Sequence, residues 1–153
     1  MTQSFRKLVL RSHAIYFGLA AAVSLVALDF QGIVRGTGPE ARLLDGAPLA
    51  GIGFVEAHGL ALIFAILFWR ATPSRMWHVT AAAVAGLLGT CNLLFWEGFV
   101  VTDSVAMGTV ATGLHLLFAM LQFAAASLRR ADLQVRQDAG PEGPAYERTG
   151  NAR

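Results

Sequence analysis

The chain carries four long apolar segments, separated by shorter stretches that are rich in glycine, proline and charged residues. A helix needs roughly 20 mostly apolar residues to cross a bilayer, because about 30 Å must be spanned at about 1.5 Å per residue. Each segment approaches this length, and only the second holds a charged residue, Glu56. The segments are residues 12–28, 49–69, 76–96 and 104–128.

We therefore predict an all-α integral membrane protein, folded as a four-helix up-and-down bundle over residues 1–130. Its helices are expected at about residues 8–29, 49–70, 76–98 and 104–128. The stretch from Asp29 to Pro48 contains four glycines and two prolines, which predicts a longer first extracytoplasmic loop that caps the bundle. Residues 131–153 are polar and are expected to form a disordered cytoplasmic tail.

Basic residues predict the orientation in the membrane, because short loops rich in lysine and arginine stay in the cytoplasm. On one side they are Arg6, Lys7, Arg11, Arg70, Arg75, Arg129 and Arg130. On the other side Arg35 and Arg42 are offset by acidic residues. We expect a multi-pass protein of the inner (plasma) membrane with both termini cytoplasmic. A signal peptide is the alternative for the first segment, although residues 26–28 make a poor cleavage site.

Composition agrees with this prediction and excludes other classes. Hydrophobic residues make up 55% of the chain and charged residues 14%, and the mean hydropathy is +0.53, which is unusual for a soluble domain. A net charge of +2, without basic stretches interleaved with aromatics, argues against a nucleic-acid partner. The single cysteine, Cys91, cannot close an internal disulfide or build a thiolate metal site. The sequence indicates no set of metal ligands.

Small and polar residues recur at helical spacing and predict the inner faces of three segments. These residues are Gly108, Thr112, His115, Ala119, Gln122 and Ala126 in the fourth segment, Ala82, Ala85, Gly89, Asn92 and Trp96 in the third, and His13, Tyr16, Ala20, Ser24 and Ala27 in the first. His13 and His78 fall near the cytoplasmic edge, where we expect them to be solvated or to meet lipid headgroups.

Glu56 and His58 lie two positions apart in the second segment and point about 200° from each other. Only one of them can face the bundle centre, and the other must lie at a helix seam or meet a partner. Depths counted from the flanking charges predict one intramembrane polar cluster, formed by Glu56, His58, Asn92, Thr112 and His115. Ionisable residues at such depth suggest function, and hydrogen bonding that holds the helices together is the alternative.

The second segment reads Gly53-Phe54-Val55-Glu56-Ala57-His58-Gly59-Leu60-Ala61-Leu62 and ends near Arg70. This pattern, with the helix order and the longer first loop, resembles DoxX-like small four-helix bacterial membrane proteins. The resemblance implies an inner-membrane subunit, in a family whose best-known member belongs to a quinone-linked oxidoreductase, and Glu56 is the matching position. His58 and His115 depart from the family pattern.

Three functions fit these features. The first is an accessory or structural subunit of a membrane complex, with a second copy or another membrane protein as partner. The second is a haem b or quinone-linked redox subunit, in which His58 and His115 would be the haem ligands. The third is a small transporter of a hydrophobic ligand, or a proton-coupled one that uses Glu56. The motifs of soluble enzymes are missing, so the sequence does not decide whether the protein is an enzyme and identifies no catalytic residue. Haem b is the only cofactor for which the sequence offers candidate ligands.

Overall fold

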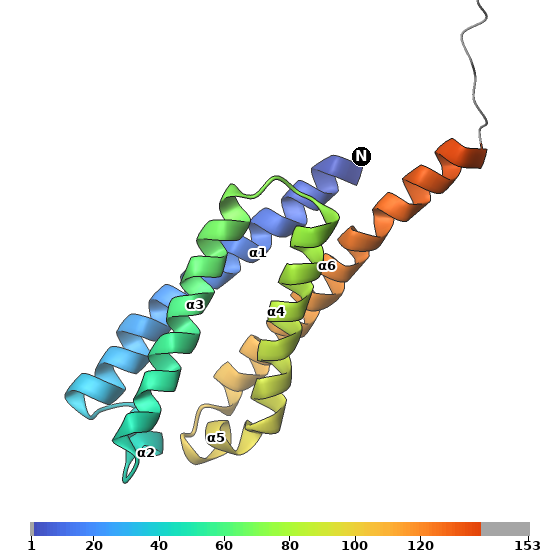
Figure 1. The fold of residues 1–153 in the computed structure, drawn as a ribbon. Coiled ribbons are helices and arrows are strands. Elements are labelled where there is room, and N and C mark those ends of the chain that lie inside the picture. The colour runs from blue at the N-terminus through green and yellow to red at the C-terminus, as the bar shows by residue number, and fades with distance from the viewer. Residues whose placement is uncertain (1, 139–153) are drawn as a thin grey trace, which may run out of the picture.

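The computed structural model describes residues 2–138 of the chain, and it describes side chains from residue 3 to residue 128. This part is helical outside its turns and contains no strand. Figure 1 shows the long helices and, at one end of the molecule, the short helices α2 and α5. The elements are α1 (Thr2–Ser24), the π-helix η1 (Leu25–Val34), α2 (Pro39–Leu44), the 3₁₀-helix η2 (Pro48–Ala50), α3 (Gly51–Arg70), α4 (Arg75–Leu94), α5 (Trp96–Val101) and α6 (Val105–Asp138).

Four helical stretches in the described residues are long and apolar enough to cross a membrane. The first combines α1 with η1, because the helix continues from one into the other without a break. The all-α fold with four candidate membrane helices is therefore confirmed. These stretches are Gln3–Val34, Pro48–Arg70, Arg75–Leu94 and Val105–Leu128.

The helix ends differ from the prediction in three places. The first helix begins at Thr2 and continues to Val34 through η1. The residues of η1 are mostly apolar and extend the apolar surface of α1. The third predicted helix is divided between α4 and α5. The last helix continues to Asp138, so the first part of the predicted tail is helical. Residues 139–153 of that tail lie outside the described residues.

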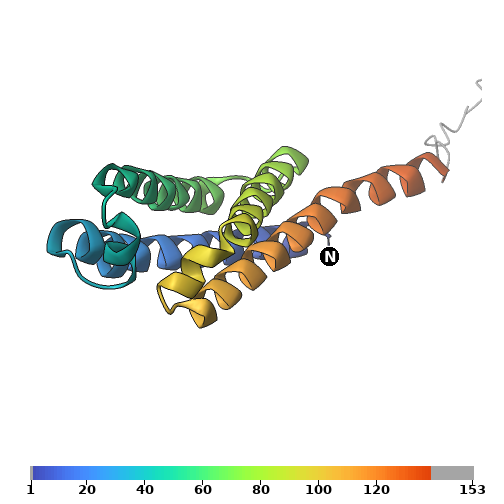
Figure 2. The same cartoon turned by 90° about the horizontal axis from the view of Figure 1, so that it is seen from below.

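The long helices pack as two pairs, α1 with α3 and α4 with α6. The pairs meet mainly where α1 crosses α6 (Figure 2). Small residues allow the close approach within each pair. A Cβ atom at Gly18 would lie 3.7 Å from the Cβ of Ala65, and one at Gly89 would lie 3.1 Å from Leu116. Small residues promote helix association in membranes in the same way.

The two ends of the bundle have different contents. One end carries α2, α5 and the last turn of η1, and we call it the α2 end (Figure 1). The opposite end, called the N-terminal end, carries the N terminus and the turn between α3 and α4. Ser74 caps α4 there by accepting a hydrogen bond of 3.3 Å from the backbone N–H of Trp77. This short turn makes α3 and α4 antiparallel (Figure 1).

The best-packed apolar core lies toward the N-terminal end and consists of Leu10, Ala14, Phe17, Ala65, Phe68 and Ala81. Ala27, from the inner face predicted for the first helix, is exposed, whereas six residues of the inner faces predicted for α4 and α6 are buried and agree with the prediction. These six are Ala85, Gly89, Gly108, Thr112, Gln122 and Ala126. Large apolar side chains on the outside of all four long helices are exposed, and a soluble monomer rarely exposes so much apolar surface.

Candidate functional site

The structure separates the two polar residues of α3. His58 is half-buried and bonds to Asp29 of η1, whereas Glu56 is exposed on the outer side of α3. This divergence follows from the rotation of about 200° between helix positions two apart. His58 is therefore the residue that faces the interior. Glu56 does not join the polar cluster that was predicted around it.

The remaining members of the predicted cluster lie on other helices. Thr112 and His115 belong to α6, which packs against α4 and α1. The His115 ring packs edge-on against Tyr16 and Phe17, with ring centroids 5.5 Å and 5.8 Å apart. Asn92 on α4 is half-buried. Among the described side chains, no hydrogen bond joins any two of the five predicted residues. Glu56 is exposed on α3, so the five do not form one cluster.

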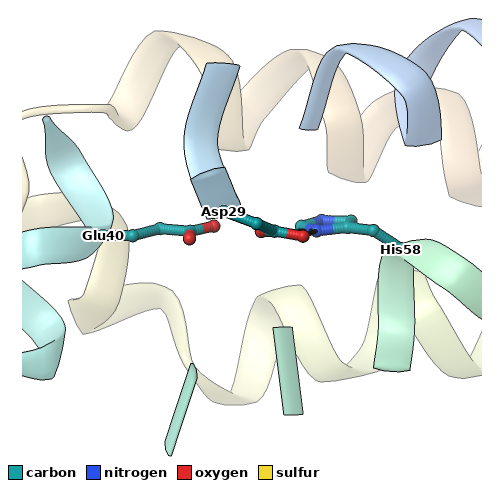
Figure 3. Close-up of side chains that lie close together, drawn as sticks. All are labelled: Asp29, Glu40 and His58. Atoms are coloured by element: carbon teal, nitrogen blue, oxygen red, sulfur yellow. Dashed lines mark hydrogen bonds and ion pairs between the residues drawn. The ribbon is translucent and has the colours of Figure 1, made fainter. Parts of the chain in front are cut away.

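Three ionisable side chains from three different elements converge at the α2 end instead, as Figure 3 shows. They are Asp29 of η1, Glu40 of α2 and His58 of α3, and we call them the acid–histidine site. The Nδ1 atom of His58 lies 2.9 Å from each carboxylate oxygen of Asp29. Glu40 approaches Asp29 from the other side (Figure 3). One ligand atom from each residue lies within 4.8 Å of the other two.

A tight backbone contact brings Glu40 to Asp29. Gly32 follows Asp29 in η1, and a Cβ atom at this position would lie only 2.6 Å from the Cβ of Glu40. Glycine therefore leaves the room that α2 needs to pack on η1. Gly38, with φ +85°, turns the chain before Pro39 begins α2, and proline suits this first helical position. Asp29 itself lies in a π-helix, a wide helical form found frequently at functional sites.

Both carboxyl groups of the acid–histidine site are removed from solvent, with Asp29 2% and Glu40 5% exposed. Burial, followed by the adjacent Asp29 carboxyl group, raises the pKa of Glu40 to about 8. Near neutral pH Glu40 is therefore mostly protonated. Its Oε2 atom is buried and has no hydrogen-bond partner in the part of the chain that the structure describes.

A second polar network lies at the N-terminal end, where Gln122 of α6 bonds to two histidines. Its Oε1 atom lies 2.5 Å from Nδ1 of His78, and its Nε2 donates to Nδ1 of His13 at 3.1 Å. Nearby, Nε of Arg6 donates to the carbonyl oxygen of Ala125 at 3.0 Å. Both histidines are 0% exposed. The expectation that they are solvated or meet lipid headgroups is wrong, because Gln122 bonds to both of them and the rings of Phe17, Phe68 and Phe118 pack around His13.

Asp29 and Glu40 are the site residues that the sequence prediction misses. It ends the first helix at Asp29 and assigns Glu40 to a loop, so neither residue is placed beside His58. One feature of the sequence could have indicated the site: Asp29 is an acidic residue at the end of an apolar segment, where it needs a polar partner. The identity of that partner depends on how α2 packs, which no periodicity in the sequence reveals.

A scan against family models, a search of curated proteins and a search of solved structures each find no match for this chain.

Proposed function

We propose that the protein is a small integral membrane subunit of DoxX-like type, which supports a membrane complex and does not catalyse a reaction by itself. Its four apolar helices cross the bacterial inner membrane, with both termini in the cytoplasm and the α2 end outside. The distribution of lysine and arginine supports this orientation. The exposed apolar surface of the helices supports insertion into lipid.

The exposed carboxyl group of Glu56 is the main evidence for a protein partner. Glu56 lies five residues, or about 7.5 Å, after the first residue of α3 and is exposed. A charged side chain in hydrocarbon costs a few kcal/mol, and such residues typically face other protein groups. Ile52, Leu60 and Ile63 lie on the same side of α3 at helical spacing and are exposed by 57%, 54% and 53%. We call these four residues the α3 face.

The proposed partner is a helix of a different membrane protein that presents a hydrogen-bond donor or a basic group to Glu56. A symmetric dimer with Glu56 at its two-fold axis would place Glu56 against Glu56, and each charge would disfavour the other. A donor from another protein would satisfy the carboxyl group, as polar side chains do between membrane helices.

The histidines support a scaffolding role over haem binding. His58 lies between α3 and η1, where Asp29 holds its Nδ1 atom. His115 instead packs on the aromatic rings of α1. The two proposed haem ligands therefore have separate surroundings in different helix pairs. Each of these contacts joins two helices, which is what a structural role requires.

The test is purification of the full-length protein in mild detergent from its own membranes, with the mass of the complex measured by light scattering. Glu56→Gln and Leu60→Trp are expected to release the partner, because both change the α3 face without touching the core. Leu87→Trp is the matched control, since Leu87 is 64% exposed on α4. A wild-type protein that is strictly monomeric, or a partner retained by both α3 variants, would contradict the proposal.

A further inference from the structure

The acid–histidine site combines the donor atoms that first-row divalent metals prefer. It offers two carboxylates and one imidazole, a set that suits zinc, manganese or iron(II). Ligands about 2.1 Å from a tetrahedral ion lie about 3.4 Å from each other. The nitrogen of His58 and the oxygens of Asp29 already lie 2.9 Å apart, and all three ligand atoms fall within 4.8 Å. Side-chain movements of up to about 1.4 Å by Glu40 and about 0.5 Å between His58 and Asp29 would complete this geometry.

An unsatisfied atom in the site points independently to a ligand. Glu40 is 5% exposed, its carboxyl group is directed at Asp29 (Figure 3), and its Oε2 atom is buried without a hydrogen-bond partner. A buried polar atom without a partner destabilises the fold, because it has lost its hydrogen bonds to water and gained none in return. Asp29 can relieve this destabilisation only while Glu40 keeps its proton, because two ionised carboxylates disfavour each other. A cation between the two carboxylates would satisfy both of them.

The protein supplies little positive charge of its own at this place. Among the described residues, the salt bridge of the site is the one between His58 and Asp29, and no arginine or lysine pairs with Asp29 or Glu40. Arg35, six residues after Asp29, donates to Gln31 and lies over the Phe30 ring instead. Arg42, two residues after Glu40, is exposed. The two buried carboxyl groups therefore share a single histidine.

We propose that Asp29, Glu40 and His58 bind one divalent transition-metal ion of the zinc type. The ligands are Nδ1 of His58 and one oxygen from each carboxylate, and a water molecule fills the fourth position. Three protein ligands with an open fourth position are a common arrangement for zinc. Because the ligands come from η1, α2 and α3, the ion ties the short helix α2 to the bundle.

The test uses the untagged full-length protein in detergent micelles, stripped with a chelator and titrated with zinc chloride in a calorimeter. One zinc ion per chain is expected, together with a rise in the thermal midpoint, because a ligand that binds only the folded state stabilises it. Glu40→Gln and His58→Gln are expected to weaken binding at least about 100-fold, since even outer partners of metal ligands contribute 10–100-fold. Asp45→Asn and Glu97→Gln remove exposed carboxylates at the same end and should leave the affinity unchanged.

The outcomes separate this proposal from the partner proposal, because zinc binding by an isolated chain does not involve the α3 face. Absence of saturable binding of zinc or manganese to the wild type overturns it, as does wild-type affinity in Glu40→Gln. If either ligand variant loses its helical circular dichroism, zinc-edge X-ray absorption of the wild type decides instead. One imidazole with oxygen donors is the expected spectrum, and a spectrum without imidazole scattering overturns the assignment.

Discussion

The contact between Gly32 and α2 makes a sharp test of how the α2 end is built. In Gly32→Ala the new methyl group would lie 2.6 Å from the Cβ of Glu40, 3.2 Å from the backbone nitrogen of Ala41 and 3.3 Å from the backbone carbon of Glu40. Carbon atoms pack best at about 3.5–4.0 Å. No side-chain rotation relieves contacts with a Cβ or backbone atom, so α2 must move by about 1 Å.

Two opposing effects determine the size of the change in stability. Overpacking of this kind costs about 1–3 kcal/mol, while alanine in place of glycine within a helix gains about 0.5–1 kcal/mol. A net loss of up to about 2.5 kcal/mol is expected, with a central value of about 1 kcal/mol. The loss is limited because α2 can leave its place, which exposes its two buried residues, Glu40 and Leu44, without unfolding the long helices.

Unfolding by sodium dodecyl sulfate in mixed micelles, followed by helical circular dichroism, measures the stability difference. Hydrogen exchange of a peptide covering α2 measures its detachment. Gly59→Ala is the matched control, because Gly59 is helical and nothing lies within 4 Å of its added Cβ. Faster exchange in α2 for Gly32→Ala alone is expected. Wild-type stability and wild-type exchange of α2 in Gly32→Ala would refute the close packing of α2 on η1.

Two further changes probe the buried polar groups. Gln122→Leu removes the hydrogen bonds to His13 and His78 and should lower the free energy of unfolding by about 1–3 kcal/mol in the same assay. Met120→Leu, at a 64% exposed position, is the control and should leave it unchanged. Equal stabilities of the two variants would argue against the network. The metal-free wild type should lose stability as pH rises from about 4.5 to about 8. Burial beside Asp29 raises the pKa of Glu40 to about 8 in the folded state, so the folded chain keeps a proton that the unfolded chain releases. Asp29 and His58 are the titratable groups beside Glu40. Glu40→Gln should flatten this pH profile, and an unchanged slope in that variant would assign the effect to another group.

The four long helices could be predicted because apolar runs of membrane length leave few alternatives for the chain. Helical periodicity also predicts that Glu56 and His58 diverge, but it does not say which one faces inward. That choice depends on Asp29, which becomes a neighbour of His58 only because the first helix continues through η1. A π-helical register and the packing of a six-residue helix are tertiary effects, and hydrophobic spacing alone does not specify them.

The flanking charges also mispredict how deeply His13 and His78 are buried. Counting from flanking charges places both residues at a membrane edge, which assumes that helices stop where the charges begin. In the structure α1 starts at Thr2, and the charged residue Arg6 is itself buried, with its Nε bonded to the carbonyl oxygen of Ala125. Charges near a helix end therefore mark the edge only when they are free of packing.

The contact between the two helix pairs has a mechanical consequence. Among the described side chains, the hydrogen bonds between the pairs join Arg6, Val9, His13 and Tyr16 of α1 to α6, and all of these lie in the first half of α1–η1. Toward the α2 end the pairs diverge (Figure 2). Local opening needs least free energy where the fewest contacts break. The two helix pairs are therefore held together at the N-terminal end, and they separate most easily at the α2 end.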